Sequence, residues 1–378
     1  MPHHRKHLSG PSRRIFLSGL AASGLAAGLS SCSRNMGVRQ DVGYIDGLSF
    51  LPEDFDMITQ SGLSAMICDV SEVEEVVDDF GVVRYQRNFA PNDAAIDAAV
   101  ARIEANSQVF VGKTGWDISS QEGCAAFLQF QSCETIGQDL SRMAYFHDKG
   151  LRILQLTHHN DNLFAGGAIE RTHTGLTNHG RDGLDEMNRI GLLPDVSHGS
   201  PATIRETAEA SRSSVVYSHG ACRALLDHPR CITDEGIKAI ADKGGVVGIF
   251  MMSFWLTKEH EPNVDHLIAH LQHVIDIGGI DAVGISNDFP MSGQQELVRL
   301  NNDNREGVKQ YLGWWRAMRE VGVAGFEEDP EHVVIPALNN ISRMAQIDLA
   351  LTEKGYGSSE RAKIMGGNWA RVLTDVLK

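Results

Sequence analysis

Eight short apolar runs recur along this chain, and amphipathic stretches separate most of them. The runs are rich in Val, Ile, Leu and Phe, as expected for parallel strands that are buried on both faces. They lie at residues 44–50, 64–70, 125–131, 151–158, 192–198, 214–219, 244–250 and 282–288. Helices are predicted over residues 94–105, 137–149, 181–190, 201–211, 234–242 and 264–277. Eight such units in roughly 250 residues are typical of an α/β protein with a (β/α)8 TIM-like barrel, and a doubly wound sheet is the alternative.

Polar residues at the ends of the runs favour the barrel. Five of the runs close on a potential metal ligand or acid–base group: Gln131, His158, His198, His219 and Asp288. In barrel enzymes the carboxyl ends of the strands form the active-site face. We therefore expect these five side chains to converge on one cleft.

The N-terminal residues are typical of an export signal. Residues 1–32 contain four basic residues and no acidic one, and Ser12–Leu17 resembles the twin-arginine motif. The apolar stretch that follows is too short for a membrane-spanning helix. Cys32 lies in a stretch similar to a lipoprotein cleavage box, and a plain cleaved signal with an incidental cysteine is the alternative. We expect residues 33–378 to form one domain, exported by the twin-arginine route and periplasmic or anchored to the membrane through a lipid on Cys32.

Charge and cysteine content exclude two classes of protein. The chain has 49 Asp and Glu against 34 Lys and Arg, a net charge of −15. Such an acidic protein is unsuited to non-specific binding of nucleic acid, which requires neutralisation of phosphates. No C-x-x-C pair occurs among the six cysteines, so a cysteine-rich structural zinc site is not expected. For the five cysteines after Cys32, the sequence allows either one or two disulfides or buried free thiols.

The residue types at the strand ends suit metal-assisted hydrolysis. Neutral imidazoles on adjacent strands, His198 and His219, can share one metal ion, although ordinary hydrogen bonding is the alternative. Asp288 could be a ligand or a general base, or simply a cap on the next segment. His158 could stabilise an oxyanion, or serve only in loop packing. Arg230 could hold a substrate carboxylate in a bidentate pair, or form a surface salt bridge.

Several spaced motifs, in order, resemble the membrane (renal) dipeptidases, peptidase family M19. They include Leu156–His158, Asp195–His198, Tyr217–His219, Asp227–Arg230 and Asn287–Asp288. The resemblance implies a metal-dependent hydrolase barrel that holds two zinc ions bridged by a glutamate and cleaves dipeptides. It implies that His198 and His219 bind one zinc and that Asp288 is the acid–base residue. It also implies that His158 contacts the oxyanion or substrate, and that Arg230 clamps the terminal carboxylate.

The chain departs from the family pattern at the other zinc site. The family's first strand carries Asp-Gly-His-x-Asp, whose His and second Asp are ligands, whereas Leu48 and Phe50 occupy those positions here. The bridging glutamate aligns with Gln131, since Glu122 lies nine residues too early. A neutral amide is a weak ligand and cannot supply the charge that holds two dications together. We therefore predict that one metal site is lost, while the other keeps His198 and His219, with Gln131 or Asp288 as an oxygen ligand.

Three functional hypotheses follow from this pattern. The favoured one is a hydrolase that cleaves dipeptides or related small amides with a free carboxylate. It is expected to bind about one zinc ion per chain, and the alternative is that zinc is absent. The second is a non-catalytic relative that binds a small ligand or assists maturation of another exported protein. The third retains hydrolysis with another substrate, such as an N-acyl amino acid or a lactone. Homodimers are expected only from the resemblance.

Overall fold

A computed structural model describes most of the compact unit Val38–Lys378, at residues 42–77, 83–119, 123–170, 172, 174–294, 305–320 and 322–378. The predicted signal with Cys32, and Glu122, lie outside the described residues. Within the described ranges, no helix combines the length and the apolar character that a membrane span requires.

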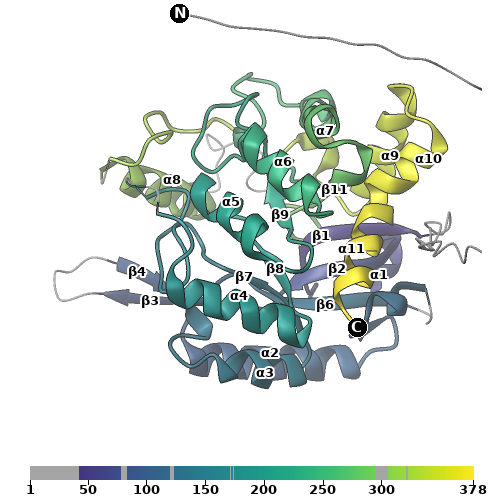
Figure 1. Cartoon of the computed structure of the whole chain (residues 1–378). Helices are drawn as coiled ribbons and strands as arrows, with labels where there is room; N and C mark the ends of the chain where they lie inside the picture. Colours follow the sequence, from purple (N-terminus) through teal and green to yellow (C-terminus); the bar gives the residue numbers. More distant parts are fainter. Residues whose placement is uncertain are drawn as a thin grey trace, which may run out of the picture. The chain divides into compact units, whose positions relative to one another are not determined.

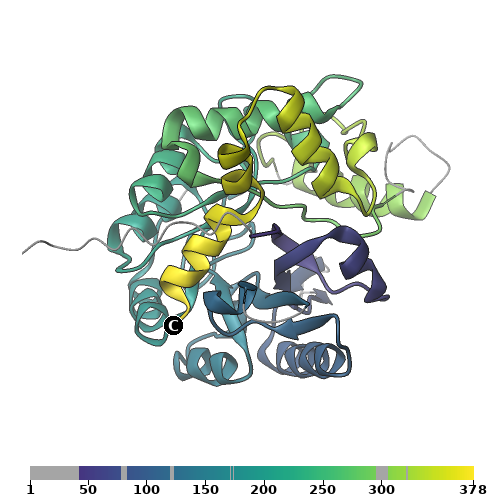
Figure 2. The same cartoon turned by 90° about the vertical axis from the view of Figure 1, so that its right-hand side faces the viewer.

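Parallel strands build the wall of a barrel (Figures 1 and 2). They form two hydrogen-bonded groups, ordered β1-β2-β6-β7-β8 and β9-β10-β11. In the described residues these eight strands span Tyr44–Phe50 (β1), Leu63–Asp69 (β2), Cys124–Phe130 (β6), Leu151–Gln155 (β7), Leu193–Asp195 (β8), Tyr217–Gly220 (β9), Val247–Ile249 (β10) and Val283–Ile285 (β11). Each overlaps one of the eight apolar runs, so the strand predictions are confirmed.

Backbone hydrogen bonds join the two groups into a ring. Between β8 and β9, the N–H of Val196 donates to the carbonyl of Val216 at 2.9 Å. Beyond the end of β11, the N–H of Asp288 donates to the carbonyl of Leu48, within β1, at 3.0 Å. Closure confirms the (β/α)8 barrel, because a doubly wound sheet would leave two open edges.

Helices pack outside the strands, as Figure 2 shows. Side-chain hydroxyls of Thr177, Ser200 and Thr233 cap the starts of α4, α5 and α6, which fixes where these helices begin. The predicted helices are confirmed as α2 (Phe89–Glu104), α3 (Ser141–Asp148), α4 (Asn178–Ile190), α5 (Pro201–Ala210), α6 (Asp234–Asp242) and α7 (Val264–Gly278). Further helices are α1 (Asp56–Ser61), α8 (Arg305–Glu320), α9 (Arg343–Glu353), α10 (Ser358–Ala362) and α11 (Asn368–Val376).

The long insertion after β2 contains additional strands. An antiparallel hairpin, β3 (Glu74–Val77) and β4 (Val83–Gln86), precedes α2, and β5 (Val109–Val111) pairs with the first half of β6. Arg87 directly follows β4 and is buried. The insertion thus brings a buried guanidinium group to the region beyond the carboxyl end of β2.

Helix α11 closes the amino-terminal end of the barrel. Trp369 is fully buried and donates its indole N–H to the carbonyl of Ile285 at 3.1 Å. One apolar cluster contains this ring together with Ile45, Ile67 and Phe127 from the strands. Closing this end leaves the opposite rim, where the polar strand ends lie, for a site.

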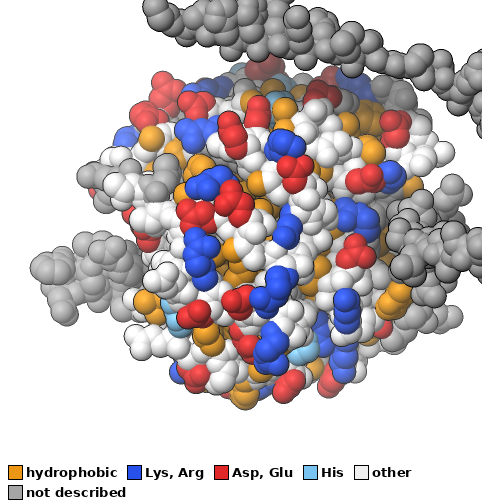
Figure 3. Space-filling view, in the orientation of Figure 1, with side chains coloured by type: hydrophobic (Ala, Val, Ile, Leu, Met, Phe, Trp, Pro, Cys, Tyr) orange, Lys and Arg blue, Asp and Glu red, His pale blue; other side chains and the backbone are white. Residues whose placement is uncertain are grey.

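The five described cysteines are free and buried: Cys68, Cys124, Cys133, Cys222 and Cys231. Of the two alternatives, disulfides or buried free thiols, the structure therefore has free thiols at these five cysteines. On the face shown in Figure 3, acidic and basic side chains alternate over α4 and α5. Ion pairs such as Arg181–Glu206, at 3.0 Å, belong to this mixed surface.

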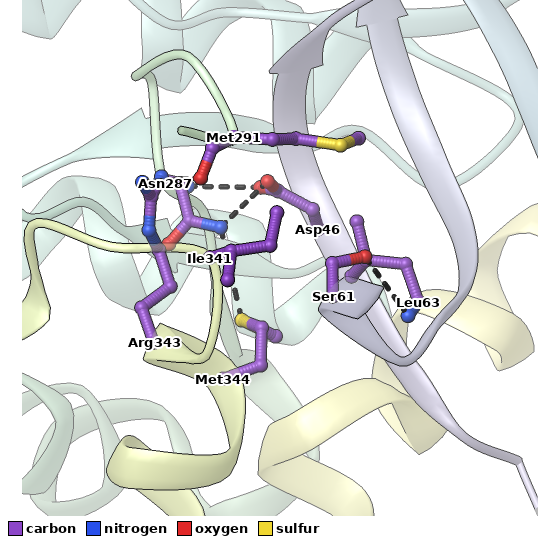
Figure 4. A pocket seen from close by; sticks show the side chains of 8 residues that line it. All are labelled: Asp46, Ser61, Leu63, Asn287, Met291, Ile341, Arg343 and Met344. Atoms are coloured by element: carbon purple, nitrogen blue, oxygen red, sulfur yellow. Dashed lines mark hydrogen bonds between the residues drawn. The ribbon is translucent and has the colours of Figure 1, made fainter. Parts of the chain in front are cut away.

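A buried carboxylate ties β1 to the segment after β11 (Figure 4). Asp46 accepts hydrogen bonds from the backbone N–H of Asn287 at 2.9 Å and from its side-chain amide at 2.6 Å. Burial raises the pKa of Asp46 to about 6, and the hydrogen bonds from Asn287 and the charge of Arg343 oppose that rise. This contact fixes the residue that immediately precedes Asp288.

We expect Gly284→Ala to destabilise the barrel. A Cβ atom at this position would lie 2.4 Å from Nε1 of Trp369, inside a packed core that cannot shift freely. The free energy of unfolding, from urea denaturation, should fall by about 1–3 kcal/mol. The matched control is Gly313→Ala in α8, where a Cβ atom would meet no described residue within 4 Å and stability should be unchanged or slightly increased. Equal effects of the two substitutions would contradict the packing argument.

We expect Asp46→Asn to remove a pH dependence of stability. The folded-state pKa of Asp46 is raised from 3.8 to about 6, so between these values the folded chain binds a proton that the unfolded chain has released. Relative to the variant, the wild type should lose stability as pH rises from about 4 to about 6.5, by at most about 3 kcal/mol. Urea denaturation across this range measures the difference, with exposed Asp182→Asn as the control. A difference that stays constant with pH would refute the assignment.

Candidate functional site

The predicted site residues lie at the carboxyl ends of their strands. Gln131 directly follows β6, and His219 is within β9. The other three, His158, His198 and Asp288, each come three residues after their strand ends. The structure brings His158, His198 and His219 together and adds His159, which the sequence analysis did not single out.

A buried carboxylate orients His219. Asp195 accepts four hydrogen bonds, from the backbone N–H groups of Ser197 and Ser218 and from the side chains of Gln129 and Ser218. The Ser218 hydroxyl donates its only hydrogen to Asp195 at 2.5 Å, so its oxygen accepts from Nδ1–H of His219 at 2.8 Å. Nε2 of His219 is therefore the unprotonated nitrogen. This carboxylate–hydroxyl–imidazole chain is the kind of outer-shell support that metal-binding histidines receive.

His198 faces His219 across adjacent strands. Their Nε2 atoms are 2.7 Å apart, and both side chains are buried. His198 has a φ of +64°, a left-handed conformation that is uncommon outside glycine. Among the described non-glycine residues, positive φ occurs only at His159, His198 and Asp288, all at this rim. Backbone strain concentrated in this way is typical of functional sites.

His158 and His159 complete a cluster of imidazole rings. The ring of His158 stacks on that of His198 with centroids 4.1 Å apart, and His159 meets His198 edge-on at 4.3 Å. Unlike His198 and His219, the side chains of His158 and His159 are partly exposed, so the cluster opens to solvent at this point. The doublet His158-His159 was visible in the sequence, but nothing there indicated that both rings turn to the same side.

The imidazoles are held in the neutral form. Burial lowers the pKa of all four rings well below the usual value. The charge of Arg230 is the next cause for His159, His198 and His219, and that of Arg87 for His158. Neutral histidine is the form that binds metal ions.

Arg230 lies beneath this cluster and not on the surface. Its side chain is buried, and it donates to the hydroxyl of Tyr217 at 2.7 Å and to the carbonyl of His219 at 3.1 Å. The guanidinium lies over the rings of Phe250 and Trp255, at 5.6 Å from each centroid. Among the described residues, its buried Nε has no hydrogen-bond partner. This geometry excludes the surface salt bridge and leaves a donor for an anionic group.

Asp288 is partly exposed at the same rim. Burial raises its pKa to about 7; the charge of Arg230 opposes the rise, and the carboxylates of Asp69 and Asp46 add to it. Its φ of +54° turns the side chain away from the extended path of β11. A carboxyl group with such a pKa can exchange a proton near neutral pH.

Two positions of the family's other zinc ligands, Leu48 and Phe50, do not fit a metal. Leu48 is fully buried in the apolar core, and neither Leu48 nor Phe50 carries a donor atom. Gln131 is buried, and its backbone donates to Ser71 and accepts from Gln155. The rejected candidate for the bridging position, Glu122, is adjacent in the sequence to Gly123. Gly123 directly precedes β6 and therefore lies at the opposite end of this strand from Gln131. By contrast, Nε2 of His198 and Nε2 of His219 face each other at 2.7 Å, a hydrogen-bond distance, and both are nitrogens of the type that binds zinc.

Comparisons of the sequence with known proteins point to one family. The sequence profile described as membrane dipeptidase, peptidase family M19, matches residues 85–305. Dipeptidase tcpJ of Claviceps purpurea is 27% identical over 67% of this chain and 51% of its own length. Dipeptidase 3 of Rattus norvegicus is 28% identical over 58% of this chain and 50% of its own length. The chain thus spans about half the length of these curated relatives.

Solved structures match over a larger share of the chain. An amidohydrolase from Pseudomonas aeruginosa has a TM-score of 0.72 and 27% identity, covering 90% of this chain and 98% of the other. A metallopeptidase from Rhodobacter sphaeroides, solved with a phosphinate mimic of L-Ala-D-Ala, has a TM-score of 0.68 at 18% identity, covering 89% and 99%. At that identity the second match shows the shared fold alone. With the profile matching more than half of its residues, the chain belongs to the membrane dipeptidase family, peptidase family M19.

Proposed function

We propose that this protein is a metallohydrolase that cleaves dipeptides, or related small amides with a free carboxylate, with one metal ion per chain. The observation that carries the proposal is the pair formed by His198 and His219, whose Nε2 atoms lie 2.7 Å apart. Zinc suits such a pair of neutral imidazoles, with Gln131 or Asp288 as the oxygen ligand. When bound, the metal would supply Lewis-acid activation of water and of the scissile carbonyl.

The remaining residues bind and orient the substrate. No described residue accepts from Nε–H of Arg230, and aromatic rings cover the guanidinium, so a carboxylate bound there would be partly shielded from water. His158, neutral and partly exposed, would donate a hydrogen bond to the oxygen on which negative charge develops. Asp288 would accept a proton from the attacking water and deliver it to the departing amine.

Loss of one metal position supports a single ion over two. The two apolar residues on β1 offer no donors, and Gln131 brings no charge. The same proposal extends to export by the twin-arginine route through residues 1–32. A non-catalytic ligand-binding role is the alternative, and the metal and turnover measurements below separate the two.

We expect purified protein to bind about one zinc ion per chain and to hydrolyse members of a mixed dipeptide library. His198→Ala should abolish both the bound metal and turnover, because it removes one of the two imidazole donors. Metal content by elemental analysis and product formation by mass spectrometry on the same sample provide the test. Exposed His260→Gln is the control and should retain both. No metal and no turnover after zinc is added back would exclude the hydrolase and favour the non-catalytic role.

We expect Arg230→Lys to weaken binding of substrates with a free carboxylate. Lysine cannot reproduce the fork of N–H donors, so KM should rise by about 10–100-fold for free dipeptides. The matched comparison is the same dipeptide with an amidated C-terminus, for which wild type and variant should differ far less. Steady-state kinetics on both substrates measure this, and an equal loss on both would mean that Arg230 does not contact the carboxylate.

A further inference from the structure

His198 has a histidine neighbour at each of its two ring nitrogens. Its Nε2 lies 2.7 Å from Nε2 of His219, and its Nδ1 lies 3.1 Å from Nδ1 of His159. The first contact is the metal position proposed above. The second lies on the other edge of the ring and involves a residue to which neither the family resemblance nor the comparisons give a role.

The backbone holds His159 in this place. Its φ of +66° places it in the left-handed region, and its carbonyl accepts from the N–H of Ile169 at 3.2 Å. In the same loop, the N–H of Ala168 donates to the carbonyl of His198 at 2.7 Å. Gly167 directly precedes these two donor residues, and a Cβ atom at Gly167 would lie 1.9 Å from the His159 carbonyl oxygen. One loop segment therefore forms hydrogen bonds with the backbones of both histidines and fixes the positions of these two residues relative to each other.

Three imidazoles meet at this edge. Single donor nitrogens of His158, His159 and His198 all lie within 4.8 Å of one another. Two nitrogens bound to one zinc at 2.0–2.1 Å with a tetrahedral angle are about 3.3 Å apart. The 3.1 Å between His159 and His198 is close to that value. His158, now stacked on His198, must turn its ring to join them, and its partly exposed position leaves room for this.

We propose that His158, His159 and Nδ1 of His198 form a second metal position, an alternative to the one between His198 and His219. Three imidazole nitrogens with an open fourth position select a late first-row divalent cation such as zinc over magnesium or calcium. A neutral imidazole has only one unprotonated nitrogen, so His198 serves one position at a time. The chain thus binds one ion, at either edge of His198.

The second position has a consequence that rests on the proposed function. An ion held there engages His158 and leaves His219 without metal, so the substrate loses its oxyanion contact. The ion at this position is therefore bound but does not support hydrolysis. The family's ligands are missing from β1, and this second position, made of nitrogen donors alone, lies instead on the other edge of the His198 ring.

Binding of Co²⁺ alone, followed by its visible absorption, tests the proposal without any substrate. His219→Gln should still bind about one ion per chain, and adding His159→Gln to it should weaken binding at least about 100-fold. His219→Gln with exposed His260→Gln is the matched control and should bind like His219→Gln. Equal affinity of His219→Gln and of the His159→Gln, His219→Gln pair would overturn the proposal. Circular dichroism confirms that each variant is folded.

A second variant keeps the test decisive if His219→Gln does not fold. His159→Cys in the otherwise unchanged chain places a thiolate at the proposed position, and a thiolate bound to Co²⁺ gives an intense sulfur-to-metal charge-transfer band. The band should appear with His159→Cys, while a cysteine replacing exposed His260 should give none. Absence of the band while Co²⁺ is bound would overturn the proposal. Since neither experiment uses turnover, failure of the proposed hydrolase and failure of this metal position are read separately.

Discussion

Closure of the parallel barrel is the constraint on which the rest of this structure depends. Parallel strands carry all their carboxyl ends to one rim, and closing the ring brings the first and last strands together there. The contact of Asp288 with Leu48 and the bonds between Asp46 and Asn287 form this junction. On the other end, α11 and Trp369 fill the barrel, so only one rim can hold a site. Asp46 and Asn287, which are 241 positions apart in the sequence, therefore lie in contact at this rim.

Buried polar groups set the chemistry of this rim. Asp195 satisfies its lone pairs within the chain, and through Ser218 it fixes which nitrogen of His219 is free. Burial and the nearby arginines keep the imidazoles neutral, the state that binds a cation. A carboxylate in direct contact with His219 would instead favour the charged ring. The intervening hydroxyl thus orients the histidine while the low pKa is preserved.

Much of this arrangement could be predicted from the sequence, for definite reasons. Strands buried on both faces leave continuous apolar runs, so β1 was predicted with the bounds that the structure has. His198, His219 and Asp288 were found because each closes such a run. His159 was not, because only the left-handed backbone at this residue and the loop through Gly167 turn its ring toward His198. Arg87 was also missed, since it reaches the rim from a hairpin that no strand pattern connects to the barrel. The spacing of residues in the sequence does not give side-chain distances, so it could not decide whether Gln131 or Asp288 completes a metal site.

The loss of the β1 ligands changes how charge is balanced at this edge. Asp46, Asp69 and Asp288 remain there, and burial raises the pKa of each. Positive charge near them now comes from side chains: Arg343 lowers the pKa of Asp46, and Arg87 lowers that of Asp69. A guanidinium group stabilises a carboxylate but offers no open coordination position. The proposed cation positions therefore both use the histidine side of the rim, and one ring, His198, is common to them.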